Sequence, residues 1–219
     1  MPSSINKKQD FSTMKSAEDV LHEYNVKGFL AKDEAEKLHS LAIEASAFGP
    51  CLELGSYCGL STVYLGTACK EKSNSLYAID HHRGSEEHQL GEEYHDPDLY
   101  DEDIAKMNSF KEFRKVMDLA ELEEHVIPIV CASNTVLKHW RTPLGLVFID
   151  GGHSEEMARQ DCLGWSQHIT RGGYLAVHDI FEKPEDGGQG PWKALQAVLN
   201  RGGFECLAQV NSLGILRKL

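Results

Sequence analysis

The chain has 219 residues, 41% of them hydrophobic, which suits one α/β domain with its own core. Its formal net charge of −12 argues against nucleic-acid binding, because contact with phosphates needs lysine and arginine. No apolar run approaches the roughly 20 residues of a membrane span, and the polar segment 1–15 lacks the apolar centre of a signal peptide. Six scattered cysteines without a C-x-x-C pair are typical of reduced thiols. We therefore expect a cytoplasmic protein with neither a nucleic-acid nor a membrane partner.

The N-terminal part, residues 1–48, predicts a loose tail followed by two helices, over Ser16–Val26 and Asp33–Phe48. The second helix has apolar residues at helical spacing, at Ala35, Leu38, Leu41, Ala42 and Ala45. We expect both helices to cap a ligand cleft in the core, residues 49–219, within one globular domain. The oligomeric state is not readable from the sequence, and pairing of these helices across a homodimer is one arrangement that it allows.

The rest of the chain alternates strand-like and helix-like segments. Strands are expected at Cys51–Leu54, Ser75–Asp80, Val126–Cys131, Leu144–Asp150, Tyr174–His178, Glu205–Val210 and Gly214–Lys218. Helices are expected at Ser61–Lys70, Asp103–Leu119, Thr135–Trp140, Glu155–His168 and Trp192–Asn200. Such alternation predicts a doubly wound, mostly parallel α/β sheet. Only three residues, 211–213, join the last two strands, so these must form an antiparallel hairpin.

The first strand ends in a distinctive turn. Glu53 lies at the strand end, and Gly55 and Gly59 follow with no glycine between them. This spacing is neither G-x-G-x-x-G nor a P-loop. A carboxylate here would repel phosphate but would accept hydrogen bonds from an ammonium or a hydroxyl group. Ser61 begins the next helix, where its hydroxyl and N–H are suited to hold a carboxylate.

Polar residues also follow the other strands, at the edge where open α/β sheets bind ligands. Asp80 ends the second strand and is suited to accept hydrogen bonds from ribose hydroxyls. Ser133 follows the third strand, where it is suited to contact a ligand and equally to be a helix N-cap, and the two roles are compatible. Asp150 and Asp179 end the fourth and fifth strands, and adjacent strands lie about 4.8 Å apart. The two carboxylates are therefore able to share one cation.

From Leu52 to Ser61 the chain reads Leu-Glu-Leu-Gly-Ser-Tyr-Cys-Gly-Leu-Ser. This motif resembles that of the class I S-adenosylmethionine-dependent methyltransferases, in particular the catechol and caffeoyl-CoA O-methyltransferase branch. The resemblance extends to about Phe181, and it implies a Rossmann-like methyltransferase fold with a seven-stranded sheet and an antiparallel C-terminal strand. It also implies cofactor contacts by Glu53, Gly55, Tyr57, Gly59, Ser61, Asp80, Ala132, Ser133 and Asp150.

The same resemblance implies a divalent metal held by an acid after the fourth strand and an acid–amide pair after the fifth. Asp150 matches the first acid, Asp179 stands at the amide position, and His178 replaces the second acid. A histidine ligand favours transition metals over Mg²⁺, but its presence is equally compatible with a site that binds no metal. His153 stands where that branch has a lysine base; near neutral pH it is suited to the same role, to metal ligation, or to a helix start.

The sequence therefore predicts transfer of a methyl group from S-adenosylmethionine to a hydroxyl of a small-molecule acceptor, with Asp150, His153 and Asp179 as catalytic residues. One alternative is a metal-independent methyltransferase in which His153 is the base. A second is a nucleotide-dependent oxidoreductase, which the absent G-x-G-x-x-G motif disfavours. A third is a sensor that binds the cofactor without catalysis.

Segment His81–Asp103 interrupts the alternation with nine carboxylates and four histidines. Loops of this length inside a compact domain are usually functional or disordered. Because it starts at the ligand edge of the sheet, we expect a lid over the acceptor. A solvated acidic loop is the alternative.

Overall fold

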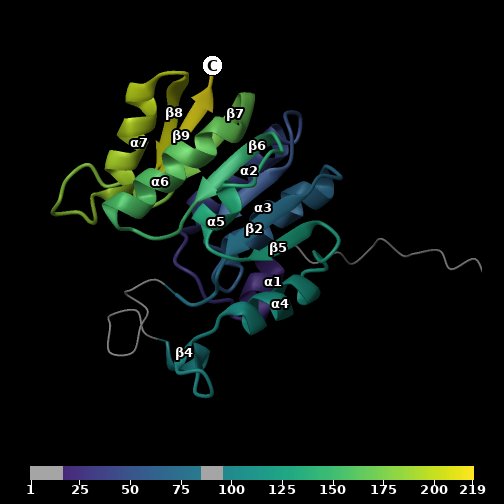
Figure 1. Ribbon diagram of the computed structural model, residues 1–219. Coiled ribbons are helices and arrows are strands. Elements are labelled where there is room, and N and C mark those ends of the chain that lie inside the picture. Colours follow the sequence, from purple (N-terminus) through teal and green to yellow (C-terminus); the bar gives the residue numbers. More distant parts are fainter. Residues whose placement is uncertain (1–16, 85–95) are drawn as a thin grey trace, which may run out of the picture.

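A computed structural model describes residues 17–84 and 96–219 of the chain (Figure 1). Its centre is a seven-stranded sheet with the strand order β5-β2-β1-β6-β7-β9-β8. The strands of this sheet are β1 (Cys51–Leu54), β2 (Leu76–Asp80), β5 (Val126–Val130), β6 (Leu144–Ile149), β7 (Ile169–Val177), β8 (Phe204–Val210) and β9 (Leu213–Lys218). A separate small hairpin pairs β3 (Tyr100–Asp101) with β4 (Lys106–Met107).

Strands β5, β2, β1, β6 and β7 run parallel to one another. Strand β9 lies between β7 and β8 and is antiparallel to both. The C-terminal hairpin follows from the short β8–β9 link, in which Val210 pairs with Leu213. The predicted doubly wound sheet with an antiparallel C-terminal strand is thus confirmed.

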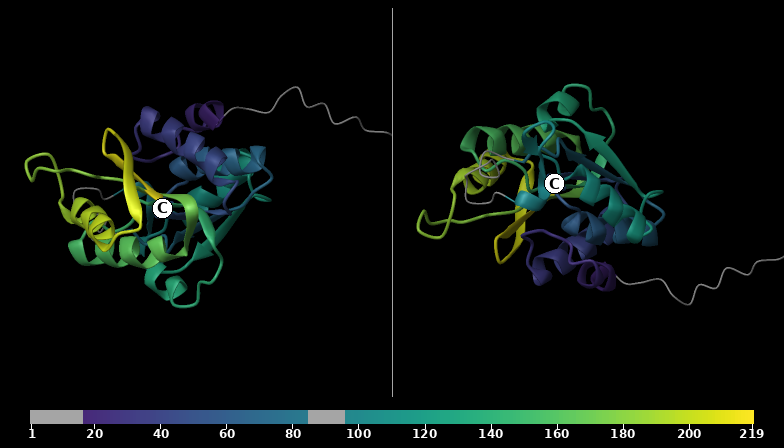
Figure 2. Two further views of the ribbon diagram at one scale, coloured as in Figure 1. Left: turned by 90° about the horizontal axis from the view of Figure 1, so that it is seen from above. Right: turned by 90° about the horizontal axis from the view of Figure 1, so that it is seen from below.

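Helices cover both faces of the sheet (Figure 2). One layer is formed by α2 (Lys32–Ala45), α3 (Leu60–Glu71) and α4 (Phe110–Leu119), with α1 (Ala17–Glu23) packed beside α3. The other is formed by α5 (Ser133–Leu137), α6 (Glu155–Trp165) and α7 (Gly190–Arg201). Short 3₁₀ turns occupy Pro97–Leu99 and Ser166–His168. Helix α2, predicted as a cap, buries Leu38 and Leu41 in the main core.

The helix predicted over Asp103–Leu119 begins only at Phe110. The preceding residues are committed to the β3–β4 hairpin, in which Tyr100 pairs with Met107, and the Asn108 N–H donates to the Leu99 carbonyl. Hydrogen bonding to the hairpin therefore overrides the local helical pattern. Residues 85–95 of the expected lid lie outside the described residues, and its role stays a prediction.

The described end of that acidic segment is tied to the link between α1 and α2. Lys27 Nζ lies 2.6 Å from Asp96 Oδ2 and 2.8 Å from Asp98 Oδ2. In the same link, the exposed ring of Phe29 lies 6.0 Å, centroid to centroid, from that of Tyr57. The N-terminal link and the segment from Asp96 onward therefore meet beside the turn that follows β1.

Each edge strand of the sheet has a feature that disfavours pairing with a further strand. Strand β5 bonds to β2 through alternate residues, with the Leu76 N–H donating to His125 and the Cys131 N–H donating to Asp80. In this register the nitrogen of Pro128 faces the open edge. Strand β8 has a register shift between Cys206 and Ala208, which makes Leu207 the extra residue of a bulge.

No helix among residues 17–84 and 96–219 is long and apolar enough to cross a lipid bilayer.

Gly145 sits where β6 meets the end of α2, and we predict that Gly145→Ala is strongly destabilising. An added Cβ would lie 2.2 Å from the Ala45 carbonyl oxygen and 2.7 Å from that of Gly49, so backbone must move. We expect a loss on the order of 3 kcal/mol in the free energy of unfolding, measured by chemical denaturation. Gly188→Ala is the control, because a Cβ there meets nothing within 4 Å. Equal stability of both variants would contradict the close contact.

Candidate active site

The backbone of the turn after β1 packs closely against the backbone at the end of β6. Gly55 has φ +88°, and an added Cβ would lie 2.1 Å from the Asp150 carbonyl oxygen. The Gly55 N–H donates to Ile79, and the Asp150 N–H donates to Leu54. Only glycine fits both this conformation and this contact. The turn and the residues after β6 therefore form one continuous edge of the sheet.

Asp80, at the end of β2, organises the same turn. Its Oδ2 accepts the N–H groups of Ser56 at 3.0 Å and Tyr57 at 2.8 Å. Its Oδ1 accepts the N–H of His82 at 2.7 Å. Tyr57 is held at φ +45° by this arrangement. Asp80 thus lies at the ligand edge as predicted from its position, while its contact with ribose stays a prediction.

Glu53 lies beneath the turn rather than at its surface. Its side chain is fully buried, and its two oxygens accept the hydroxyls of Ser61 and Thr62, each at 2.6 Å. Burial raises the pKa of Glu53 to about 7, although these two hydrogen bonds oppose the rise. The hydroxyl of Ser61 is therefore turned toward Glu53, and the cofactor contacts expected of both residues stay predictions.

Ser133 follows β5 at the start of α5, and its hydroxyl faces α6. It donates to Asp161 Oδ1 at 2.5 Å and accepts from Trp165 Nε1 at 2.7 Å. The N-cap of α5 is Ala132, so the interpretation of Ser133 as the cap is corrected. The reason is that the hydroxyl bonds across to α6 instead of bonding within its own helix.

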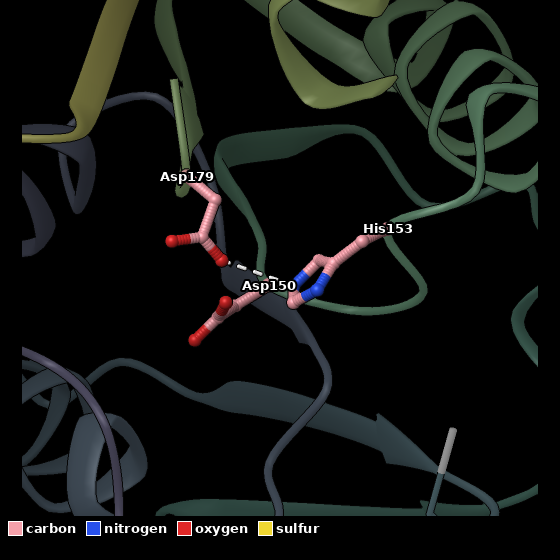
Figure 3. A group of neighbouring side chains, drawn as sticks. All are labelled: Asp150, His153 and Asp179. Atoms are coloured by element: carbon pink, nitrogen blue, oxygen red, sulfur yellow. Dashed lines mark ion pairs between the residues drawn. The ribbon is translucent and has the colours of Figure 1, made fainter. Parts of the chain in front are cut away.

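The ends of β6 and β7 bring three potential ligand groups together (Figure 3). Asp150 directly follows β6, His153 lies three residues further, and Asp179 follows β7 after His178. One donor atom of each lies within 4.8 Å of the others. His153 Nε2 is 3.0 Å from Asp179 Oδ2, and Figure 3 shows Asp150 beside this pair. The three residues predicted as catalytic are thus brought together, while their roles stay predictions.

Asp179 is held in an unusual backbone conformation, with φ +56°. Burial would raise the pKa of its carboxyl group, but hydrogen bonds from His153 and His178 outweigh burial and hold the pKa well below its usual range. The carboxylate is consequently ionised at neutral pH, and it orients the His153 ring.

His178 lies outside the group of three and is buried between carboxylates. Its Nδ1 donates to Asp150 Oδ1 at 3.1 Å and lies 3.6 Å from Asp179 Oδ2. Its Nε2 lies 3.1 Å from Glu34 Oε2. Burial opposes protonation, yet the hydrogen bonds and charges of Asp150 and Asp179 raise the pKa of His178 to about 11.

Both ring nitrogens of His178 face carboxylates, those of Asp150 and Glu34, whereas His153 offers a donor atom within 4.8 Å of donor atoms of Asp150 and Asp179. The geometry therefore replaces one of the expected metal ligands. His153, rather than His178, forms the potential metal group with Asp150 and Asp179. The physical reason is the neighbouring carboxylate on α2, which bonds to the second ring nitrogen of His178.

That carboxylate, Glu34, was not identified from the sequence. It is buried in the first turn of α2 and accepts from His178, from the Ala31 N–H at 3.1 Å, and from the N–H and hydroxyl of Ser212 at 2.8 and 2.9 Å. Glu34 and His178 are separated by 144 residues. The only sequence signal was an acid at a first-turn position, which helix starts commonly have for electrostatic reasons.

The carboxylates at this edge of the sheet fit S-adenosylmethionine better than a phosphate-bearing nucleotide. Asp80, Asp150 and Asp179 place carboxylates beside the turn, and these suit hydroxyl, ammonium and sulfonium groups. At Gly151 an added Cβ would meet only Asp161 Oδ2, at 3.8 Å, so the backbone is open to a ligand there. The set of two carboxylates and one imidazole also fits a divalent cation.

Comparison with known proteins identifies the family of the chain. A family model described as a methyltransferase domain matches residues 52–180. The chain therefore belongs to the methyltransferase-domain family, and its sheet is that of the class I S-adenosylmethionine-dependent methyltransferases.

Three solved structures illustrate the shared fold. An O-methyltransferase from Bacillus cereus in complex with S-adenosylhomocysteine has 14% identity and a TM-score of 0.63, covering 92% of this chain and 90% of its own. The O-methyltransferase TomG from Streptomyces achromogenes, in complex with S-adenosylmethionine, has 14% identity and a TM-score of 0.60, with 92% and 87% covered. The S-adenosylhomocysteine-bound methyltransferase PaMTH1 from Podospora anserina has 10% identity and a TM-score of 0.64, with 93% and 87% covered.

The elevated pKa of Glu53 predicts a pH-dependent stability difference between the wild type and Glu53→Gln. The folded protein keeps a proton that the unfolded chain releases near pH 4.5, the ordinary pKa of a glutamate. This contribution to stability is complete below pH 4.5 and is lost as the pH rises through about 7. Relative to the variant, the free energy of unfolding of the wild type should fall by about 3 kcal/mol between these two pH values, at about 1.4 kcal/mol per pH unit.

Denaturant titrations at about pH 5 and about pH 8 measure this difference. Because the comparison is between two proteins at each pH, titration of other groups largely cancels. A wild-type advantage that does not change with pH would show that Glu53 is ionised throughout.

Removing the charge of Glu34 should destabilise the fold. Glu34→Gln leaves His178 without one of its buried carboxylate partners, and breaking a buried pair costs on the order of 3 kcal/mol. Glu36→Gln is the control, because Glu36 is exposed on the same helix and lies 3.8 Å from the exposed Lys32. Its effect should stay within about 0.5 kcal/mol. Denaturation near neutral pH measures both, and similar losses would argue against the Glu34–His178 pair.

Proposed function

We propose that this methyltransferase transfers the methyl group of S-adenosylmethionine to a hydroxyl oxygen of a small-molecule acceptor. The proposal depends mainly on the ion pair between His153 and Asp179. This pair lies beside Asp150, at the same edge of the sheet as the turn after β1. A base oriented by a carboxylate suits an acceptor that must lose a proton. The O-methyltransferases among the similar structures support the same chemistry at the level of a shared fold.

The transfer is an in-line displacement at the sulfonium methyl group. The acceptor oxygen forms a bond to the methyl carbon as the carbon–sulfur bond breaks, and S-adenosylhomocysteine leaves. The acceptor proton goes to His153: in the neutral ring, Nε2–H donates to Asp179, so Nδ1 takes the proton. Asp179 then stabilises the imidazolium that forms. The negative charge of Asp150 and Asp179 favours the cationic cofactor near the acceptor.

Asp150, His153 and Asp179 would also hold a divalent ion. Such an ion, when bound, lowers the pKa of a coordinated hydroxyl and so assists its deprotonation. The mixed nitrogen and oxygen donors favour Mn²⁺, Fe²⁺, Co²⁺ or Zn²⁺ over Mg²⁺. In that form of the reaction His153 is a ligand instead of the base.

One observation favours the metal-independent form. The imidazolium of His178 already lies 3.1 Å from Asp150 and 3.6 Å from Asp179, so a fixed cation balances these carboxylates. His153 is 39% exposed on its side chain, which leaves it accessible to an acceptor from solution. Membership of the methyltransferase family disfavours the oxidoreductase alternative.

We predict that His153→Asn lowers turnover by about 100-fold or more while leaving cofactor affinity within about threefold. Release of S-adenosylhomocysteine is measured over a panel of phenols, sugars and other hydroxyl compounds, and cofactor affinity is measured by calorimetry. His139→Asn, at an exposed position after α5, is the matched control and should retain wild-type turnover. A His153→Asn protein with normal turnover would refute this role of His153.

Excess chelator separates the two forms of the reaction. In the metal-independent form, turnover survives the chelator and falls in His153→Asn. In the metal-assisted form, chelator abolishes turnover and Mn²⁺ or Zn²⁺ restores it. A wild type that releases no S-adenosylhomocysteine with any acceptor, although it binds the cofactor, would favour the sensor alternative.

A further inference from the structure

A cavity outside the proposed active site lies between the link that joins α1 to α2, helix α4 and the turn Pro97–Leu99. Figure 1 shows α1 and α4 beside each other at this place. The cavity encloses about 270 Å³, and among the described residues its lining includes none of Asp150, His153 and Asp179. Sites for drug-sized ligands usually measure roughly 300–1,000 Å³. This cavity therefore suits a smaller molecule.

The walls of the cavity are fixed by contacts between distant parts of the chain. Lys27 Nζ, in the α1–α2 link, lies 2.6 Å from Asp96 Oδ2 and 2.8 Å from Asp98 Oδ2. On the other side, α4 packs against the start of α3, since a Cβ added to Gly59 would lie 3.0 Å from the Met117 side chain. The space between these walls is consequently part of the folded structure.

Part of the lining is apolar. Leu99 and Val116 are buried although they line the cavity, and Val26 and Leu119 are half-buried beside them. The thiol of Cys58, in the turn after β1, also lines it, and burial raises the pKa of this thiol to about 12, so it is uncharged at neutral pH. An apolar ligand body is stabilised here because it leaves water.

The charged groups at the cavity have an excess of negative charge. Lys27 is balanced by Asp96 and Asp98. Glu112 Oε2 lies 3.4 Å from Lys115 Nζ on the same helix, and such exposed pairs contribute little. In these five groups three carboxylates accompany two ammonium groups, so one negative charge is in excess. The carboxylate of Glu112 is thus suited to accept a hydrogen bond from a cationic ligand.

We propose that this cavity binds a small molecule that has a protonated amino group on an apolar body. The ammonium group donates to Glu112, and the apolar body packs against Val26, Leu99 and Val116. An anionic ligand of the same shape is repelled by Glu112, and a neutral one lacks the charge-assisted hydrogen bond. The site is independent of the proposed methyl transfer, because the two share no residue.

Three probes of similar size test the proposal: n-hexylamine, 1-hexanol and hexanoate. Methyl-group NMR near neutral pH measures affinity and place together, since valine and leucine side chains line the cavity. We expect n-hexylamine to shift the signals of Val26, Leu99, Val116 and Leu119, and to bind about tenfold more tightly than the other two probes. Equal affinity for all three probes would overturn the proposal.

Glu112→Gln removes the charge and keeps the shape of the side chain. It should weaken n-hexylamine about tenfold and leave the affinity for 1-hexanol unchanged. Asp118→Asn is the matched control, because Asp118 is exposed on the same helix and does not line the cavity. The control should bind n-hexylamine like the wild type. Unchanged amine binding in Glu112→Gln would also overturn the proposal.

The carboxylates of the proposed active site could attract an amine as well, and the same spectra distinguish the two places. Ile149 and Val177 lie beside that site. Shifts confined to their signals, with those of Val26 and Leu99 unmoved, would refute the cavity as the amine site. Calorimetry with S-adenosylhomocysteine keeps the two proposals apart: Glu112→Gln should bind it like the wild type, and a wild type that does not bind it would contradict only the proposed methyl transfer.

Discussion

The buried imidazolium of His178 is the interaction on which the acidic edge of the sheet depends. It holds Asp150 on one side, Glu34 on the other and lies near Asp179, so a single cation balances carboxylates from β6, β7 and α2. Without it, these groups would repel one another in a poorly solvated site. Glu34 also bonds to Ser212 in the β8–β9 link. The positions of the N-terminal helix, the C-terminal hairpin and the reacting groups are consequently coupled through one ring.

The architecture was predictable because the sheet has strong local signals. The central strands are short apolar runs, and the three-residue link before β9 permits only a hairpin. Residues 103–109 misled the prediction, since their helical pattern competes with hydrogen bonds to residues earlier in the chain. Local patterns specify elements well where the core reinforces them, and poorly where a distant partner supplies the hydrogen bonds.

Placement of the site residues followed from one rule, that parallel strands end at the same edge, and this rule located Asp80, Asp150 and Asp179. It did not reveal the state of each side chain. His178 resembled a ligand by position, but Glu34, 144 residues away, bonds to its second nitrogen. Ser133 likewise turned toward α6 through Asp161. Such pairings depend on packing between helices that the sequence does not state, so roles assigned from strand ends alone are incomplete.

The two edge strands of the sheet constrain how copies of the chain can associate. A strand added at β5 would find no donor at Pro128, and a strand added at β8 would meet the bulge at Leu207. The side chains of Ile127 and Val130 are nevertheless exposed on β5, the latter by 54%. An unprotected edge with these residues would invite stacking into a continuous intermolecular sheet. The proline and the bulge oppose that outcome, so any self-association is expected to proceed through helical surfaces.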